Sequence, residues 1–552
     1  MMSSLAPAVL RRFEMRHWLT AVTAATVLFC VPAMVGQKKI QVWLTTPDKT
    51  HLLAEEPQPL VFSKIGAGVN VITVDDSQKF QVMDGFGFAL TGGSAQLMMK
   101  MSAPTRTALL HELFGRVSGE IGTSYLRVSV GASDMNDHVY TYDDMPAGET
   151  DPALAHFSLG SDQADVIPVL KEILAITPAI KILASPWTAP SWMKTDDDPK
   201  GGALKPEFHQ AYADYWVKYL KGMQAEGIKI DALTVQNEPE NPKNTPSMVM
   251  TADEEAAFIG KNLGPALANA GLTTKIIDFD HNCDHPEYPE AILRDPVAAK
   301  YTDGSGFHLY RGTIDAMTTV HTAFPNKNLY FTEQMVVSRR NDTGMNIAGP
   351  VARLIVGAPE NWSRNVLLWN FAADPQNGPH TANGGCPVCT GAITLDGDAV
   401  TRNIAYYTVA QAAKFVPAGS VRIASTGSGT PPHVAFRTPD KHHVLIVANP
   451  SAEAVTFTIS NKKKGRRGDV AGGSRGDLCL VSAKLFSEIL HDSLHSSCDV
   501  CFRCLHHARH TGRAVLLSAA ARRQGCHLSD KGQLRRCGRR SRRRYRRTAK
   551  SR

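Results

Sequence analysis

Two glutamates, Glu238 and Glu333, place an ionisable group directly after an apolar segment. Glu238 follows the run "ALTVQN" (232–237), and Glu333 follows "LYFT" (329–332). A carboxylate in such a setting is costly unless its charge is paired or used. Two carboxylates on either side of a substrate suit glycoside hydrolysis, in which one donates a proton and the other attacks the anomeric carbon. Each glutamate taken alone is equally explained as a salt-bridged structural residue.

The segments that would position these glutamates repeat along the chain. From residue 85, short runs rich in β-branched or aromatic residues alternate with longer amphipathic stretches, one of which carries Tyr212, Tyr215, Trp216 and Tyr219 at helical spacing. The eight runs cover residues 85–91, 125–131, 181–187, 232–239, 275–282, 306–310, 329–334 and 366–371. Eight strand–helix units predict an α/β fold, a (β/α)8 TIM barrel. An open doubly wound sheet is the alternative, although no dinucleotide-binding glycine fingerprint follows the first run.

Such a barrel would bring the two glutamates to one place. The C-terminal ends of the strands form the active face of (β/α)8 barrels. Almost every run begins apolar and ends in polar or aromatic residues, and Glu238 and Glu333 end the fourth and seventh runs. We therefore expect the two carboxylates to face each other across the mouth of the barrel.

The two flanks of the barrel predict a second domain. Residues 37–76 and 416–460 contain short alternating runs separated by turn residues, which is typical of half-buried strands. We predict one β-sandwich built from both flanks, beside a barrel at residues 77–415. After residue 460 the composition changes abruptly to a basic, Cys- and Arg-rich tail (461–552). We expect this tail to be disordered or frameshift-derived, which would leave the sandwich incomplete with one unpaired edge.

The net charge of +8 comes from that tail. Residues 461–552 hold 24 Lys and Arg against 6 Asp and Glu, whereas residues 1–460 hold 36 against 46. The body is therefore acidic, and the overall charge gives no reason to expect a nucleic-acid partner. The alternative is that the tail arginines bind nucleic acid and that "CDVCFRC" with His506 and His507 forms a zinc knuckle.

Residues 1–36 predict an export signal. Arg11, Arg12 and Arg16 precede an apolar run that is too short for a comfortable membrane span. We expect a secreted or periplasmic protein with no stable membrane span after signal cleavage. An uncleaved N-terminal membrane anchor is the alternative.

The cysteines of the body are too few for a disulfide framework. Apart from the signal and the tail, the chain keeps only Cys283, Cys386 and Cys389. A large exported domain with three cysteines is held together by its core. The "CPVC" sequence at 386–389 is either a local disulfide or half of a metal site.

Six segments in this order make the chain resemble glycoside hydrolase family 30, which contains glucosylceramidases and endo-β-1,6-glucanases. They are "LRVSVGASDMNDHVYTYDD", "SPWTAPSWMKT", "TVQNEPE", "GFHLYRG", "LYFTEQM" and "NVLLWNFAADPQNGP". The resemblance covers about residues 40–460 and implies a (β/α)8 barrel with an attached β-sandwich. One difference is Gly92, because some relatives place an acidic residue there.

The resemblance also implies roles for individual residues. Glu238 matches the acid/base, Glu333 the nucleophile, and Asn237 the asparagine that binds the sugar 2-hydroxyl; a β-bulge before Pro239 would let Asn237 and Glu238 both reach the mouth. The other expected substrate-binding residues are Arg127, Asp134, Trp187, His308, Tyr310 and Trp369. We expect Arg127 to lower the pKa of Glu333, one of His308 and Tyr310 to hydrogen-bond Glu333, and the two tryptophans to offer flat faces to a pyranose.

These observations predict an exported retaining β-glycosidase that needs no metal or cofactor. An exo-β-glucosidase of glucosylceramidase type is the first expectation, and an endo-β-1,6-glucanase or another retaining β-glycanase is the alternative. Either would act on a β-glucoside or β-glucan. A carbohydrate-binding pseudoenzyme is the competing hypothesis outside the enzyme class.

Overall fold

The computed structural model of the 552-residue chain describes residues 39–61, 70–338, 344–461, 480–485 and 497–500. The predicted signal peptide lies outside the described residues, as does most of the tail that follows residue 461. In the described part of the chain, no helix combines the length and the apolar character that crossing a bilayer requires.

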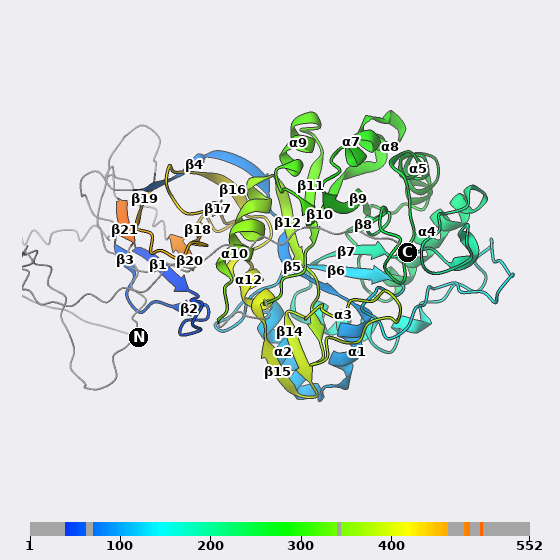
Figure 1. The fold of residues 1–552 in the computed structure, drawn as a ribbon, viewed down its shortest axis with the longest axis horizontal. Coiled ribbons are helices and arrows are strands. Elements are labelled where there is room, and N and C mark those ends of the chain that lie inside the picture. The colour runs from blue at the N-terminus through cyan, green and yellow to red at the C-terminus, as the bar shows by residue number, and fades with distance from the viewer. Residues whose placement is uncertain (1–38, 62–69, 339–343, 462–479, 486–496, 501–552) are drawn as a thin grey trace, which may run out of the picture. The chain divides into compact units, whose positions relative to one another are not determined.

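Eight parallel strands close into a barrel, which confirms the predicted fold class (Figure 1). The strands are β5 (Gly85–Leu90), β6 (Tyr125–Val130), β7 (Lys181–Pro186), β8 (Ala232–Thr234), β9 (Lys275–Cys283), β10 (Thr302–Gly312), β11 (Asn328–Glu333) and β12 (Ser363–Leu368). Each predicted run contains or overlaps one of these strands. They pair in chain order, and β12 closes the barrel on β5.

Helices follow the strands around the barrel (Figure 1). They are α1 (Gly92–Lys100), α2 (Ala103–Phe114), α3 (Val166–Ile176), α4 (His209–Ala225), α5 (Ala252–Phe258), α6 (Gly264–Asn269), α7 (Glu287–Arg294), α8 (Pro296–Tyr301), α9 (Ala316–Ala323), α10 (Ala348–Pro350), α11 (Gly357–Glu360) and α12 (Ile404–Ala413). Helix α4 buries the predicted aromatic stripe, because Tyr212, Tyr215, Trp216 and Tyr219 all lie in the core. One face of this helix therefore packs on the barrel.

The second domain is a β-sandwich formed by both flanks of the barrel. Its strands run in the order β2 (Ala54–Glu55), β1 (Lys39–Leu44), β20 (Leu480–Leu485), β18 (His443–Ala448), β17 (His433–Arg437), β16 (Val421–Thr426), β4 (Val71–Val82), β19 (Phe457–Asn461) and β21 (Ser497–Val500), with β3 (Leu60–Val61) beside β1. A small separate sheet consists of β13 (Ala372–Ala373), β14 (Ile393–Asp396) and β15 (Ala399–Arg402).

The sandwich extends beyond residue 460, where the sequence analysis ended it. Strand β20 pairs with both β1 and β18, and β21 pairs with β19. One strand from the tail, β20, therefore lies inside the sheet, and the other, β21, lies at one end of the strand order. Composition misplaced this boundary because a six-residue strand needs only a short run such as "LVSAKL" inside an otherwise basic segment.

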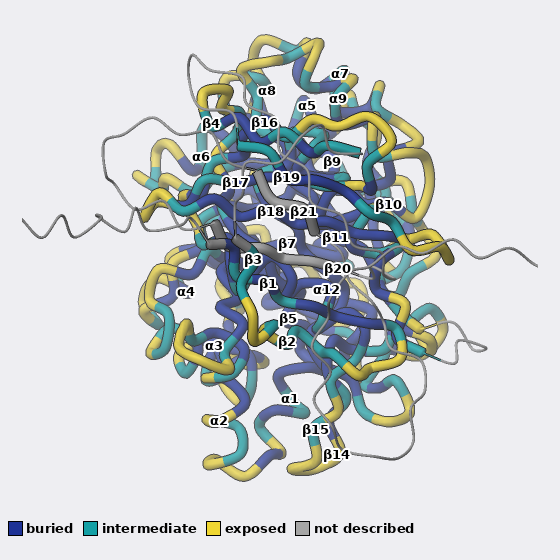
Figure 2. Tube along the Cα trace, turned by 90° about the vertical axis from the view of Figure 1, so that its left-hand side faces the viewer, coloured by how far each residue is buried: buried dark blue, intermediate teal, exposed yellow. Residues whose placement is uncertain are grey.

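Strands β17 and β18 join the two domains because both of their faces are buried. Val434, Phe436 and Val444 belong to the same apolar cluster as the barrel helices, whereas Ala435 and Leu445 belong to the interior of the sandwich. Successive side chains of a strand point to opposite faces, which produces this division. In Figure 2 the trace is coloured as buried along β5, β7 and β18, and the exposed residues lie on the peripheral helices and loops.

Candidate active site

The inside of the barrel changes from apolar to polar toward the C-terminal ends of the strands. An apolar layer consists of Tyr125, Leu183, Ala232, Ile277, Tyr330 and Leu367. Two residues further along four of these strands stand Arg127, Ser185, Thr234 and Thr332, all fully buried. Residues two apart on a strand point to the same side, so this second, polar layer also faces the barrel axis.

Asp280 joins the polar layer through a bulge in β9. Phe279 and Asp280 have φ angles of 70° and 54°, and the pairing of β9 with β10 skips Asp280 between Gly306 and Phe307. A bulge adds one residue to a strand and re-aims its side chain. Asp280 thus points inward although it lies three residues after the inward-facing Ile277.

Glu238 reaches the mouth through a left-handed backbone conformation. Strand β8 ends at Thr234, and the Glu238 N–H donates to the Asp280 carbonyl at 3.1 Å, with a φ angle of 46° at Glu238. The prediction of a β-bulge before Pro239 is therefore wrong, because β8 has already ended at Thr234. The left-handed turn brings both Asn237 and Glu238 to the site, where each accepts a hydrogen bond from a site residue.

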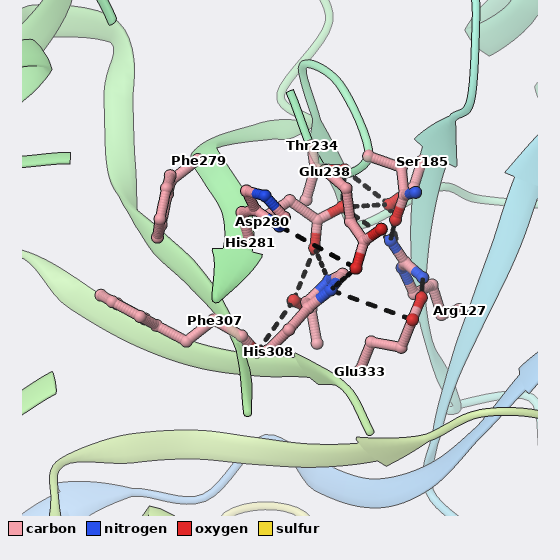
Figure 3. A network of polar contacts seen from close by, with 12 residues as sticks. Arg127, Ser185, Thr234, Glu238, Phe279, Asp280, His281, Phe307, His308 and Glu333 are labelled. Atoms are coloured by element: carbon pink, nitrogen blue, oxygen red, sulfur yellow. Dashed lines mark hydrogen bonds and ion pairs between the residues drawn. The ribbon is translucent and has the colours of Figure 1, made fainter. Parts of the chain in front are cut away.

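His308 lies between the two predicted catalytic carboxylates (Figure 3). Its Nδ1 is 3.1 Å from Glu238 Oε1 and 3.9 Å from Glu333 Oε1, so these two oxygens are no more than about 7 Å apart. Its Nε2 is 3.0 Å from Asp280 Oδ1. This limit accommodates the carboxyl separation of about 5–5.5 Å that is typical of retaining glycosidases.

Arg127 connects the same groups from the other side. Its Nη1 donates to Glu333 Oε2 at 2.5 Å, and its Nη2 donates to Asn237 Oδ1 and Asp280 Oδ2, each at 2.7 Å. The side chain is fully buried, so these charged hydrogen bonds are shielded from water. Tyr310 OH donates to the other oxygen of Glu333, Oε1, at 2.9 Å.

The pKa values in the site depend on burial and on this network. Burial would raise the pKa of Glu238, but the hydrogen bond and charge of His308 outweigh it and lower the pKa to about 2. Burial would lower the pKa of His308, but the Glu333, Asp280 and Glu238 carboxylates raise it to about 9. The proton between Glu238 and His308 therefore rests on the imidazole.

Glu333 does not follow the sequence expectation. Burial, together with the charges of Glu238 and Asp280, raises the pKa of Glu333, although Arg127 and His308 act in the opposite direction. Arg127 thus lowers this pKa as expected, but the desolvation that accompanies the buried ion pair outweighs its effect.

A cavity of about 570 Å³ opens above these residues. Its lining includes Glu238, Glu333, Asp134, Tyr310 and Trp369. The rest of the lining consists of Glu240, Asn241, Lys243, Asn244, His281, Asn282 and Arg311, with Pro242, Met335, the segment 384–387 and Cys389. This cavity has the size and the convergent polar groups of a small-molecule site.

A strap at residues 381–389 crosses one side of the mouth. The Thr381 N–H donates to the Asp134 carbonyl at 3.0 Å, and the Thr245 N–H donates to the Gly384 carbonyl at 3.3 Å. A Cβ at Gly384 would lie 2.5 Å from Thr245 Oγ1, so only glycine allows this approach. Cys386 and Cys389 form a disulfide, which decides between the two predicted alternatives for "CPVC".

The predicted tryptophans differ in how they meet the cavity. Trp369 lines it, but Trp187 is 2% exposed and does not. The Arg127 guanidinium lies 4.9 Å from the Trp187 ring centroid, and the Trp369 ring lies 5.2 Å away. The Trp187 ring therefore supports Arg127 and Trp369 and leaves no open face for a sugar.

The other predicted residues all lie at the site. Tyr310 is the residue that hydrogen-bonds Glu333, whereas His308 bonds Glu238 and Asp280. Asp134 has a buried Oδ1 without a hydrogen-bond partner, and burial raises its pKa well above the usual range. A Cβ at Gly92 would lie 2.0 Å from Asn136 Nδ2, so a larger residue there would displace the Asn136 side chain.

Three residues of the site were not predicted as site residues. Asp280 binds Arg127 and His308, His281 lines the cavity, and Asn241 donates to Glu238 Oε2 at 2.7 Å. The polar end of the run "KIIDFDHN" was the available signal for the first two. Asn241 lies in a turn beyond Pro239, and nothing in its spacing indicated a contact.

Profiles of known domain families match both domains of the chain. The glycosyl hydrolase family 30 TIM-barrel domain matches residues 83–416, and the β-sandwich domain of the same family matches residues 419–476.

Relatives of this chain include glucanases and glucosylceramidases. An endo-1,6-β-D-glucanase of Neurospora crassa is 35% identical over 411 residues, which cover 71% of this chain and 84% of that protein. The lysosomal acid glucosylceramidase of Mus musculus is 32% identical over 432 residues, 73% of this chain and 81% of that protein. Among solved structures, the endo-β1,6-glucanase BT3312 has a TM-score of 0.74 at 32% identity, with 82% of this chain and 100% of that chain covered.

Proposed function

Because this chain belongs to glycosyl hydrolase family 30 and is a retaining β-glycosidase, we propose that it acts as an endo-β-1,6-glucanase. The supporting observation is a cavity lined by several charged and amide side chains above two carboxylates that share one histidine, in a chain whose relatives include endo-1,6-β-glucanases. This favours the alternative of the sequence analysis over its first expectation, an exo-acting glucosylceramidase.

Glu333 is the nucleophile in this proposal. Arg127 and Tyr310 each donate to a different oxygen of Glu333, which fixes the carboxylate and stabilises its charged form. Attack on the anomeric carbon forms a glycosyl–enzyme bond and expels the leaving-group oxygen. When Glu333 becomes an ester, it loses the charge that Arg127 neutralises and that Tyr310 hydrogen-bonds, and hydrolysis of the ester restores this charge.

Glu238 is the acid and then the base. It must hold a proton when the leaving oxygen departs, and His308 Nδ1, 3.1 Å from its Oε1, supplies one. Asp280 accepts from His308 Nε2 and keeps the imidazole in place when the proton leaves Nδ1. In the second step Glu238 takes a proton from the attacking water.

Asn237 and Asp134 bind the sugar. Arg127 holds Asn237 by its Oδ1, which leaves the Nδ2 donor for the 2-hydroxyl. A hydrogen bond at this hydroxyl strengthens as the transition state forms. Asp134 offers its unpartnered oxygen to another hydroxyl at the wall of the cavity.

The outer cavity supports a sugar, not a lipid, as the leaving group. Glu240, Lys243, Asn244 and Arg311 line it and can hydrogen-bond hydroxyl groups. The apolar part of the lining comes from Trp369, Met335, Pro242, Pro387 and the Cys386–Cys389 disulfide, and the charged and amide side chains share the cavity with it.

The test compares a linear β-1,6-glucan, a β-1,3-glucan, nitrophenyl β-glucoside and glucosylceramide as substrates of the purified chain. We expect the β-1,6-glucan to be cleaved fastest, with a mixture of oligosaccharides released early in the reaction. Release of glucose alone would indicate exo action, and faster cleavage of glucosylceramide would replace this proposal with a glucosylceramidase. Glu333→Gln is the control for contaminating activity and should retain less than about one part in 10³ of the rate.

A further inference from the structure

Glu238, His281 and His308 converge on one point at the wall of the cavity (Figure 3). In the part of the chain that the structure describes, they are the one set of three His, Cys, Asp or Glu residues whose ligand atoms all lie within 4.8 Å of one another. All three are buried, and Glu238 and His281 line the cavity.

His308 is oriented in the way that metal-binding histidines usually are. Its Nε2 lies 3.0 Å from the Asp280 carboxylate, and its Nδ1 faces Glu238 Oε1 at 3.1 Å. A carboxylate on the far nitrogen fixes the ring and makes the near nitrogen a better ligand.

His281 provides a second, independent sign of a ligand. The residue is 8% exposed, and its Nδ1 has no hydrogen-bond partner, yet this atom lies 3.9 Å from the same Glu238 oxygen. A buried polar atom without a hydrogen-bond partner costs free energy. Because this atom also points at other potential ligand atoms, a bound ion would satisfy it.

We propose that Glu238, His281 and His308 form an inhibitory binding site for a divalent transition-metal ion, with Zn²⁺ as the best-suited ion. Two imidazole nitrogens and one carboxylate oxygen are a ligand set that zinc prefers, and the cavity leaves the fourth position open. Zinc ligands at tetrahedral geometry are about 3.3 Å apart. The longest spacing, at most 4.8 Å, therefore shortens when the ion binds.

The ion would inhibit because it occupies the proposed acid/base. When zinc bonds to Glu238 Oε1 and His308 Nδ1, the proton that rests on His308 Nδ1 is released to solvent, so Glu238 has no proton to deliver. The ion also blocks the leaving-group side of the cavity. Mg²⁺ and Ca²⁺ prefer all-oxygen ligands and would bind poorly.

The experiment measures nitrophenyl β-glucoside or β-1,6-glucan hydrolysis by the chelator-treated full chain against increasing Zn²⁺, with Mg²⁺ as the matched ion. We expect Zn²⁺ to inhibit hydrolysis in competition with the substrate, and we expect EDTA to restore the full rate. Mg²⁺ at the same concentration should have no effect. Calorimetric titration with Zn²⁺ gives a readout of binding that does not depend on turnover.

His281→Asn is the decisive variant, and His285→Asn is its matched control, because His285 is a more exposed histidine beside acidic residues. His281→Asn should weaken zinc binding and raise the inhibition constant, relative to its own uninhibited rate, by at least about 10-fold. His285→Asn should change neither. Zinc bound by the cysteines of the tail would persist in both variants. Equal inhibition constants in the wild type and His281→Asn would overturn the proposal.

Discussion

At the scale of single residues, one imidazole and one guanidinium organise the whole reaction centre. His308 lies within 4 Å of both carboxylates, and Arg127 binds Glu333, Asn237 and Asp280 at once. The two glutamates therefore have different hydrogen-bond partners. Glu333 accepts from Arg127 and Tyr310, whereas Glu238 is bonded to His308 and Asn241. Such different surroundings allow two identical side chains to take different parts in the reaction.

The assignment of these parts can be tested by small-anion rescue. In Glu333→Ala, azide can occupy the space of the nucleophile and attack once, which inverts the centre and gives the α-glycosyl azide. In Glu238→Ala, the glycosyl–enzyme still forms from a nitrophenyl glycoside, and azide then gives the β-glycosyl azide. NMR of the products distinguishes the two anomers. Products of the opposite configuration would exchange the proposed roles.

Residue types at strand ends carried enough information to locate these two glutamates but not their supports. Glu238 and Glu333 each follow a strand-like run, so a barrel alone brings them to the mouth. Asp280 was not predicted because alternation from Ile277 puts it on the outer face, and only the bulge at Phe279 reverses this. Trp187 was overinterpreted, since composition cannot reveal that a guanidinium covers its ring.

At the scale of elements, all eight barrel strands could be predicted because each is a short apolar run between amphipathic stretches. The boundary of the sandwich could not, because β20 and β21 lie in a segment whose composition is not that of a folded domain. The contacts of the strap also depend on loop conformation, which has no periodic signal.

The packing of α5 against β9 includes two buried acids. Glu255 accepts from the Phe279 N–H at 3.1 Å and from Tyr288 OH at 2.9 Å, and neighbouring Asp278 has two carboxylate oxygens without partners. Burial raises the pKa of Glu255 to about 7, and it raises that of Asp278 well above the usual range.

This interface predicts a stability that declines with pH. Between about pH 4.5 and 7, the unfolded chain loses the Glu255 proton while the folded chain keeps it, so the free energy of unfolding falls as pH rises. Glu255→Gln cannot ionise at this position. Its free energy of unfolding, measured relative to that of the wild type, should therefore rise by on the order of 3 kcal/mol from pH 5 to pH 8. Urea unfolding at both pH values measures this. Asp253→Asn changes an exposed residue of the same helix, and its free energy of unfolding should change with pH as that of the wild type does. The same pH dependence in Glu255→Gln as in the wild type would contradict the prediction.

At the scale of the whole molecule, the barrel and the sandwich share one apolar core. Phe436 of β17 is fully buried, and its ring centroid lies 6.3 Å from that of Phe86 on barrel strand β5. Side chains of β17 and β18 therefore pack against the outside of the closed barrel.

A shared core predicts that the two domains unfold together. Phe436→Ala should lower the free energy of unfolding by about 3–5 kcal/mol, because it removes a ring from between the domains. Loss of enzymatic activity, which reports on the barrel, and loss of far-ultraviolet circular dichroism should coincide in urea for the wild type and for the variant. Two separated transitions would show that the domains are energetically independent.

Because the strap contains a disulfide, the covalent state of the enzyme depends on the redox conditions of the compartment in which it is made. The Cys386–Cys389 bond lies in the lining of the cavity, and Cys389 packs against the cluster that contains Trp187 and Trp369. A host whose cytosol keeps thiols reduced would produce the same polypeptide without this link. Preparations from reducing and oxidising hosts should therefore differ at the rim where the substrate enters, although their sequences are identical.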